Sequence, residues 1–438
     1  MSTSQTRSRA LVATGASCLA VAAVALAIPP SSARVPVRPT TSVSPTPAAA
    51  DSGLTRTQQH LRQVPGDWQA WAGLGLAYVE QAKATVDPTY YPKAQAALLR
   101  SLSLQRSGNF VAMAGQAALA AARHDFRGAL TWARRGLAID PQSAVLYGAR
   151  ADALTQLGRY SAAAAAARKM ELLRPGADAE ARLSYAAELR GDVPAARTFM
   201  RLALAHAVDP AGTAFARYYL GELALTAGHP QAALRQYDAG LAADSGYAAL
   251  REGRAKAEAA LGRTSAARRD FAVVVAEVPQ PTYVLEYGRL LQSLGRTRAA
   301  RQQYDVFRAE EKLFVANGVT LDTDQTLFEA DHGAPATAVA AGSAALRTRP
   351  FLESYDAYAW ALHRAGRDRA ALVAADRALQ TGMRSALFHF HRGVIESVLG
   401  QRRAAHRDVA AALRINPQFD PLAAPVARRL LEATAVTR

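Results

Sequence analysis

The sequence contains little cysteine and few aromatic residues. Its one cysteine, Cys18, lies in an amino-terminal apolar segment, so the rest of the 438-residue chain has no disulfide, thiolate metal site or cysteine nucleophile. Aromatic residues make up 7% of the chain, and no run of alternating β-branched and aromatic residues predicts a strand. Much of the apolar content is alanine, the best helix former, so the composition predicts an all-α fold.

The motifs of several enzyme classes are also missing. The chain has no GxxxxGK loop to cradle phosphates, no GxSxG nucleophile elbow, no HExxH zinc motif and no GxGxxG turn that opens a helix after a strand. The sequence therefore gives no positive support for catalysis. We expect a protein that is not an enzyme and needs no cofactor.

The charge balance is basic. Lysine and arginine number 52 against 36 acidic residues, which gives a formal net charge of +16. A surplus of arginine is typical of proteins that contact phosphate or nucleic acid. Here the acids are mixed with the bases along the chain, and this pattern disfavours nucleic acid as a partner. Binding of an anionic polymer is kept as an alternative function.

The amino terminus has the pattern of an export signal. Residues 1–9 carry two arginines and no acid, residues 10–28 are uncharged, and small residues follow. This order predicts a secretory signal peptide over residues 1–33. The alternative is an uncleaved signal anchor, since residues 10–28 are just long enough to span a bilayer. In either case we expect an extracytoplasmic protein, secreted or associated with the cell envelope. It would touch the membrane only through this segment, and only if the segment is not cleaved.

Residues 34–52 are rich in proline, serine and threonine and predict a disordered linker. The following body, residues 53–438, repeats itself. One phrase recurs as LGRYSAA, LGRTSAA, LGRTRAA and LGQRRAA, and glycines recur 34 residues apart, as from Gly228 to Gly262 and from Gly366 to Gly400. An apolar-periodic helix, a glycine turn and an alanine-rich helix alternate throughout. This period predicts stacked helix pairs.

The repeats resemble a known family. WAGLGLAY at residues 71–78 matches the opening signature of the tetratricopeptide repeat, W-x2-L-G-x2-Y, and AIDP and RINP resemble its closing signature. The resemblance implies an α-solenoid superhelix of about ten helix pairs, closed by a C-terminal capping helix that covers the last apolar face. We expect units to begin near Trp68, Phe110, Ala144, Ala177, Ala214, Ala248, Pro281, Val319, Leu352 and Ala386.

The same resemblance implies a binding groove on the concave side, lined by the first helix of each pair. Positions five and nine of these helices predict the groove residues Tyr185, Tyr218, Glu222, Lys256, Arg289 and Trp360. Large aromatic side chains there could anchor a protein or peptide partner. An alternative interpretation is that several of them are core residues in a slightly different register. The function we predict is that of a non-enzymatic exported scaffold.

The stretch FHFHRG raises the possibility of a metal site. His389 and His391 are two residues apart, and such residues point to nearly opposite sides of a helix. They cannot both ligate one ion, although His406 on the next helix could lie near either of them. We expect these histidines to have packing roles.

A second candidate is LDTDQTLFEADH, which holds five possible ligands: Asp322, Asp324, Glu329, Asp331 and His332. Their spacing differs from that of a helix–loop–helix calcium loop, and the loop's glycine is missing. An acidic first turn of a helix, stabilised by the helix dipole, explains the aspartates as well. The segment Asp322–His332 nevertheless keeps an alternative function open: an enzyme subunit or metal-binding protein of the cell envelope.

Overall fold

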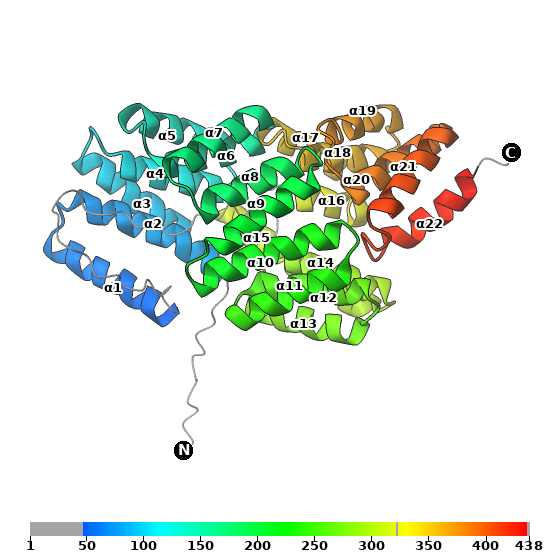
Figure 1. The fold of residues 1–438 in the computed structure, drawn as a ribbon, viewed down its shortest axis with the longest axis horizontal. Helices are drawn as coiled ribbons and strands as arrows, with labels where there is room; N and C mark the ends of the chain where they lie inside the picture. Colours follow the sequence, from blue (N-terminus) through cyan, green and yellow to red (C-terminus); the bar gives the residue numbers. More distant parts are fainter. Residues whose placement is uncertain (1–46, 321–322, 436–438) are drawn as a thin grey trace, which may run out of the picture.

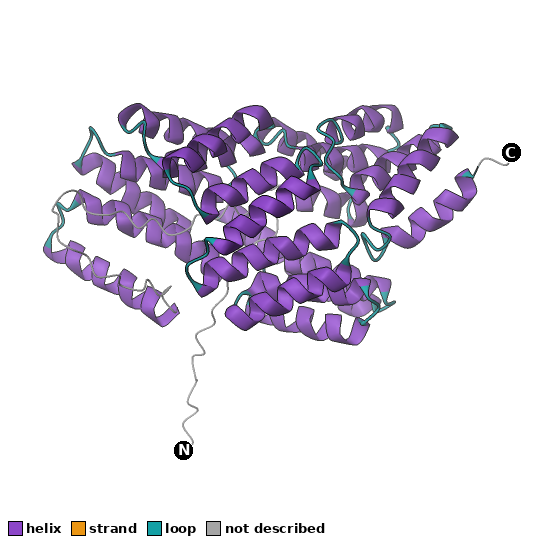
Figure 2. Cartoon of the chain, in the orientation of Figure 1, coloured by secondary structure: helices purple, strands orange, loops and turns teal. Residues whose placement is uncertain are grey.

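The computed structural model describes residues 47–320 and 323–435, with side chains from residue 53 onward. Every regular element in these ranges is a helix, so the predicted all-α fold is confirmed. After α1 (Pro47–Gln63), helices follow in pairs up to α21, and each pair packs against the next. Figures 1 and 2 show one continuous curved array that ends in α22 (Ala423–Thr434), the predicted capping helix.

The first helices of the pairs are α2 (Trp68–Thr85), α4 (Phe110–Ala122), α6 (Ala144–Gln156), α8 (Ala177–Glu188), α10 (Pro210–Thr226), α12 (Ala248–Ala260), α14 (Pro281–Ser293), α16 (Thr323–His332), α18 (Leu352–Arg364) and α20 (Ala386–Val398). The second helices are α3 (Tyr90–Leu104), α5 (Phe126–Ile139), α7 (Tyr160–Leu173), α9 (Val193–Ala205), α11 (Pro230–Ala243), α13 (Thr264–Glu277), α15 (Thr297–Ala316), α17 (Pro335–Thr348), α19 (Asp368–Ala378) and α21 (Arg402–Ile415).

Eight of the ten predicted unit starts coincide with the first residue of a helix, and two are shifted. Helix α10 begins at Pro210 instead of Ala214, because Asp209 caps it: the backbone N–H of Gly212 donates to the Asp209 carboxylate at 2.7 Å. Proline at the first helical position favours the same start. Helix α16 begins at Thr323, after the predicted start at Val319.

Two features at the ends of the array bear on the predicted boundaries. Helix α1 begins at Pro47, inside the 34–52 segment that we expected to be an extended linker. The predicted signal segment, residues 1–33, lies outside the described residues. Export therefore stays a prediction from the sequence.

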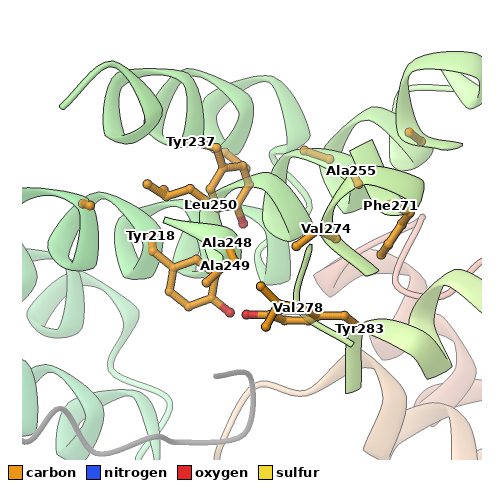
Figure 3. Packing of buried hydrophobic residues seen from close by; sticks show 14 of the residues in the cluster. Tyr218, Tyr237, Ala248, Ala249, Leu250, Ala255, Phe271, Val274, Val278 and Tyr283 are labelled. Carbon is orange, nitrogen blue, oxygen red and sulfur yellow. The ribbon is translucent and has the colours of Figure 1, made fainter. Parts of the chain in front are cut away.

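The paired helices approach closely where the first helix carries glycine. A Cβ atom at Gly221 of α10 would overlap the Tyr237 ring of α11, and one at Gly288 of α14 would overlap the Tyr304 ring of α15. Each tyrosine ring therefore packs directly on the backbone of the partner helix. Figure 3 shows Tyr237 in the core between α10 and α14, with Tyr218, Leu250 and Tyr283 around it.

The superhelix also touches itself across one full turn. The backbone N–H of Thr320 donates to the Arg123 carbonyl at 3.0 Å, the backbone N–H of Leu352 to the Tyr160 hydroxyl at 3.1 Å, and the Asn416 amide to the Leu225 carbonyl at 2.9 Å. The residues that meet are 191 to 197 positions apart, which is between five and six repeats. Loops at the middle of early units thus dock on loops between later units.

Three turn glycines lie at these contacts. A Cβ atom at Gly158 would overlap the Pro350 carbonyl, and one at Gly191 would overlap the Gly382 carbonyl; at Gly228 it would lie 3.0 Å from the Ile415 carbonyl. Gly262, with a similar positive φ of 73°, has no atom within 4 Å of such a Cβ. Gly158, Gly191 and Gly228 therefore have two roles. Each adopts the positive φ of the loop within its helix pair, and each leaves room for the backbone of the next superhelical turn.

Candidate functional site

The predicted groove residues fall into three environments. Tyr218 is only 3% exposed and belongs to the core shown in Figure 3, as the alternative interpretation of its register expected. Glu222, Lys256, Arg289 and Trp360 are partly buried and engage neighbouring side chains of the same chain. Tyr185 lines a pocket. The six residues therefore do not form one continuous exposed surface.

Glu222 and Lys256 belong to a buried charge cluster. The Lys256 ammonium lies 3.1 Å from a Glu222 oxygen and 3.1 Å from a Glu252 oxygen, and the Tyr237 hydroxyl donates to Glu222 at 2.6 Å. Burial lowers the pKa of Lys256, but the neighbouring carboxylates outweigh it and the net shift is upward. Burial raises the pKa of Glu252 to about 8, against the lowering effect of Lys256. The charge of Lys256 is therefore compensated by carboxylates inside the fold.

Arg289 and Trp360 meet at one aspartate. The Trp360 indole N–H donates to Asp331 at 2.9 Å, and the Arg289 guanidinium lies 3.6 Å from the same carboxylate. Trp360 also stacks on the His391 ring, with centroids 4.3 Å apart and planes at 16°. Helices α14, α16, α18 and α20 are thereby joined by side-chain contacts. Trp360 is thus part of the contact between successive first helices.

The histidines of the FHFHRG stretch have separate partners. The His389 ring bonds to Asp408 of α21 at 2.7 Å, whereas the His391 ring bonds to Asp356 of α18 at 2.9 Å. The two side chains leave α20 in different directions, as their spacing predicts. His406 lies near Thr434 of the capping helix. Each ring therefore holds a helix–helix contact.

The acidic segment at α16 is also divided among different neighbours. Asp324 accepts a hydrogen bond from the Thr282 hydroxyl at 2.9 Å, while Asp331 binds Trp360. His332 packs on the Tyr304 and Phe328 rings, and burial lowers its pKa. Asp322 lies outside the described residues. In the part of the chain that the structure describes, no three histidine, cysteine or acidic side chains gather as metal ligands would.

A pocket opens between α6, α8 and α10. Its apolar wall includes Met200, Phe215, Tyr219 and Leu223, and its polar groups include Tyr185 and Glu188, both on α8. The Arg182 guanidinium at its edge makes two hydrogen bonds to Asp152, at 2.9 and 2.7 Å, so this pair is electrically balanced. The wall is apolar and aromatic, and the polar groups are few, which is the usual character of a ligand pocket.

Glu188 is the charged group of this pocket that lacks a counterion. Within the described residues, no hydrogen bond or ion pair engages its carboxylate, and the Tyr185 hydroxyl nearby is buried without a hydrogen-bond partner. Burial, together with the carboxylates of Glu222 on α10 and Glu353 on α18, raises the pKa of Glu188 to about 7. Among the described residues, Glu188 is therefore a carboxylate of this pocket without a counterion.

Sequence reasoning did not single out Glu188, although a signal was present. Glu188 is the twelfth residue of the unit that begins at Ala177, and this position of a tetratricopeptide-like first helix usually faces the concave side. Our prediction used only positions five and nine. Reading the twelfth position as well would have placed Glu188 beside Tyr185.

No helix in the described ranges has the length and apolar character needed to cross a membrane. No protein-family profile and no curated protein matches the chain.

Solved structures of low sequence identity resemble the chain. A tetratricopeptide repeat protein of Parabacteroides merdae matches 59% of this chain and 98% of its own, at 19% identity and a TM-score of 0.35. The match to a thermophilic TPR protein of Thermus thermophilus covers 43% of this chain and 98% of that protein's chain, at 21% identity and a TM-score of 0.39. The match to human IFIT1, solved as a dimer with PPP-AAAA, covers 84% of this chain and 87% of that chain, at 13% identity and a TM-score of 0.46.

These TM-scores are all below 0.5, so the likenesses carry no argument about binding or activity. The classification rests instead on the chain's own features: helix pairs in a 34-residue period, glycine at the close approach within pairs, and a capping helix at the end. By this architecture the chain is an all-α solenoid of tetratricopeptide-like helix pairs.

Proposed function

We propose that this protein is a non-enzymatic scaffold that acts outside the cytoplasm and binds an extended polypeptide along the inner face of its superhelix. The observation that carries the proposal is the pocket between α6, α8 and α10, which is apolar and aromatic and has an unpaired carboxylate. Most other charged groups of the inner face are paired with one another. The pocket is therefore where a partner gains most from binding.

The alternatives have less support. An enzyme or metal-binding protein at Asp322–His332 would need those side chains to converge, and the described ones bind separate neighbours. An anionic-polymer binder would need unpaired basic side chains near the pocket. There Arg182 is paired with Asp152, and Glu188 adds negative charge.

Site-specific photo-crosslinking in the native cell tests the proposal. Tyr219 in the pocket wall is replaced by a photoreactive phenylalanine, and the matched control carries the same residue at Leu172, which is 79% exposed on α7. We expect a discrete crosslinked protein from position 219 and none of that mass from position 172. Equal products from both positions, or none from position 219, would contradict binding on the inner face.

Location is tested separately. A reporter that is active only outside the cytoplasm, fused after Arg438, should be active because of the signal pattern in residues 1–33. An inactive reporter on a full-length cytosolic protein would reject export and leave the binding proposal standing.

A further inference from the structure

We propose that the pocket between α6, α8 and α10 binds the basic side chain of an arginine or lysine in the bound polypeptide, with Glu188 as its counterion. The inference rests on the proposed function, since it names the chemistry of the partner that the inner face accepts. Three observations carry it: the charge balance of the pocket, its aromatic wall, and a buried hydroxyl with unused hydrogen-bonding capacity.

The charge balance excludes an anionic ligand. The Arg182 guanidinium is already held by both oxygens of Asp152, at 2.9 and 2.7 Å, so it offers little to an incoming anion. Glu188 has no counterion within the described residues, and the carboxylates of Glu222 and Glu353 lie near enough to act on it. Glu188 is half-buried, so water solvates its charge only in part, and a bound cation would compensate that charge.

The shape and lining of the pocket favour a cation on a long apolar stem. Phe215, Tyr219 and Leu223 supply aromatic and aliphatic surface, and the aromatic centroids of Phe215 and Tyr219 are 4.8 Å apart. The methylene stem of arginine or lysine buries well on such a wall while its charged end reaches a carboxylate. Guanidinium groups also stack on aromatic faces, so arginine should bind more tightly than lysine.

The Tyr185 hydroxyl supplies a further contact. It is buried, has no hydrogen-bond partner in the described structure, and lies on the same helix three residues before Glu188. A hydroxyl oxygen accepts hydrogen bonds, and a guanidinium or ammonium group donates them. One basic side chain can therefore satisfy Tyr185 and Glu188 together. A metal ion would find only one free carboxylate here among apolar groups, which is too few oxygen ligands.

Peptide display tests the inference. Random linear dodecapeptides are selected on the immobilised full chain, and the affinities of the selected peptides are measured by fluorescence anisotropy. We expect arginine or lysine at one fixed position of the selected consensus. Glu188→Gln should weaken a selected peptide by about tenfold or more, the effect usual for a charge-assisted contact. Glu277→Gln, on the exposed surface of α13, is the matched control and should leave the affinity unchanged.

A double-mutant cycle identifies the contact. Replacing the consensus arginine by citrulline removes its charge but keeps its shape. Citrulline should weaken binding to the wild-type chain by a similar factor and have little further effect on the Glu188→Gln variant. Additive effects, or a consensus without a basic residue, would overturn the inference while the proposed function stands. Failure to select any peptide would overturn both.

One competing occupant belongs to the chain itself. Residues 34–46, RVPVRPTTSVSPT, contain two arginines and no acid. A synthetic peptide of this sequence is therefore measured beside the selected peptides. If it binds more tightly than they do, and with the same dependence on Glu188, the pocket's ligand is the chain's own linker, and a separate partner for this pocket is rejected.

Discussion

The Arg289 guanidinium lies 2.6 Å from the carboxylate of Asp420, although 131 residues separate the two in the chain. Asp420 also accepts hydrogen bonds from the backbone N–H groups of Leu422 and Ala423, at 2.8 and 2.6 Å, just before the capping helix α22. Burial raises the pKa of Asp420, but Arg289 and these backbone groups outweigh it, and the net shift is downward. One carboxylate thus ties the C-terminal cap to α14.

Asp420→Asn should destabilise the fold by about 1.5–3 kcal/mol at pH 7, the usual worth of hydrogen bonds to a charged group. Because the folded-state pKa of Asp420 is lowered, the ionised carboxylate stabilises the fold above the unfolded pKa, and this contribution is lost as pH falls through the folded value. Urea unfolding at pH 7 and at pH 3 measures the difference, which should shrink at pH 3. The control is Asp305→Asn. Asp305 pairs with Arg308 but is 76% exposed, so this variant should change the free energy of unfolding little at either pH. Equal effects of both variants would contradict the prediction.

Gly221→Ala should cost about 1–3 kcal/mol of stability, the usual effect of overpacking, because the added Cβ overlaps the Tyr237 ring. Gly73→Ala is the matched control in α2, where a Cβ meets no atom within 4 Å. There alanine should stabilise by about 0.5–1 kcal/mol, since glycine is the poorer helix former. Thermal unfolding of both variants measures the contrast. A stabilised Gly221→Ala protein would reject the tight packing of α10 on α11.

Trp360→Ala should lower stability by about 3–5 kcal/mol, the usual cost of removing a packed tryptophan. The indole stacks on His391 and donates to Asp331, so the loss falls on the contact between α16, α18 and α20. Trp360→Phe keeps one aromatic ring to pack on His391 and removes the hydrogen bond and the second ring of the indole, and it should cost less than the alanine variant. Chemical denaturation of the two variants measures these values. A stable alanine variant with weakened partner binding would return Trp360 to the group of binding residues.

Much of the fold could be predicted because its determinants are local. Glycine at a left-handed turn and small residues at the close approach of paired helices recur about every 34 residues. These landmarks predicted the starts of α6 and α18 correctly from nearby residues. The start of α10 was missed because the Asp209–Pro210 cap precedes the repeat landmark used to set the register. The aspartate cap and the proline were local signals for this start, but they are signals of helix capping and not of the repeat.

The groove residues were harder to predict because side-chain partners come from other units. Nothing near Arg289 in the sequence indicates that Asp420 neutralises it, and nothing near Tyr218 indicates that it lies at 3% exposure in one core cluster with Tyr283 of α14. The contacts between successive superhelical turns, such as Tyr160 with Leu352, join residues so far apart in the chain that no local sequence pattern indicates them. They depend on the accumulated curvature of several helix pairs.

Glu188→Gln should stabilise the free protein at pH 8. The folded-state pKa of Glu188 is about 7, above its ordinary value of 4.5, so ionisation costs stability as pH rises from the unfolded pKa through the folded one. Glutamine removes that cost, which we expect to be about 1–3 kcal/mol at pH 8 and close to zero at pH 4. Thermal unfolding across this range measures it. A variant less stable than the wild type at pH 8 would show that Glu188 has a stabilising partner.

Binding of an arginine-containing peptide should tighten as pH rises from 6 to 8, because the Glu188 carboxylate ionises in this interval. The charged and titratable groups that face Glu188 or lie in its pocket are Tyr185, Tyr219, Asp152, Arg182, Glu222 and Glu353. Of these, the Tyr185 pKa is shifted upward by burial, away from the interval. Fluorescence anisotropy at a series of pH values measures the affinity. A profile that persists in Glu188→Gln would assign the titration to another group.

The contacts between successive superhelical turns change how this repeat protein should unfold. In an open array each unit contacts only its neighbours, so unfolding can begin at an end and spread along the chain. Here the Gly158 turn rests on Pro350 and the Gly191 turn on Gly382, so loss of a late unit removes support from an early one. Each superhelical turn therefore stabilises the next. The thermal transition should be one cooperative event in which both ends of the solenoid unfold together.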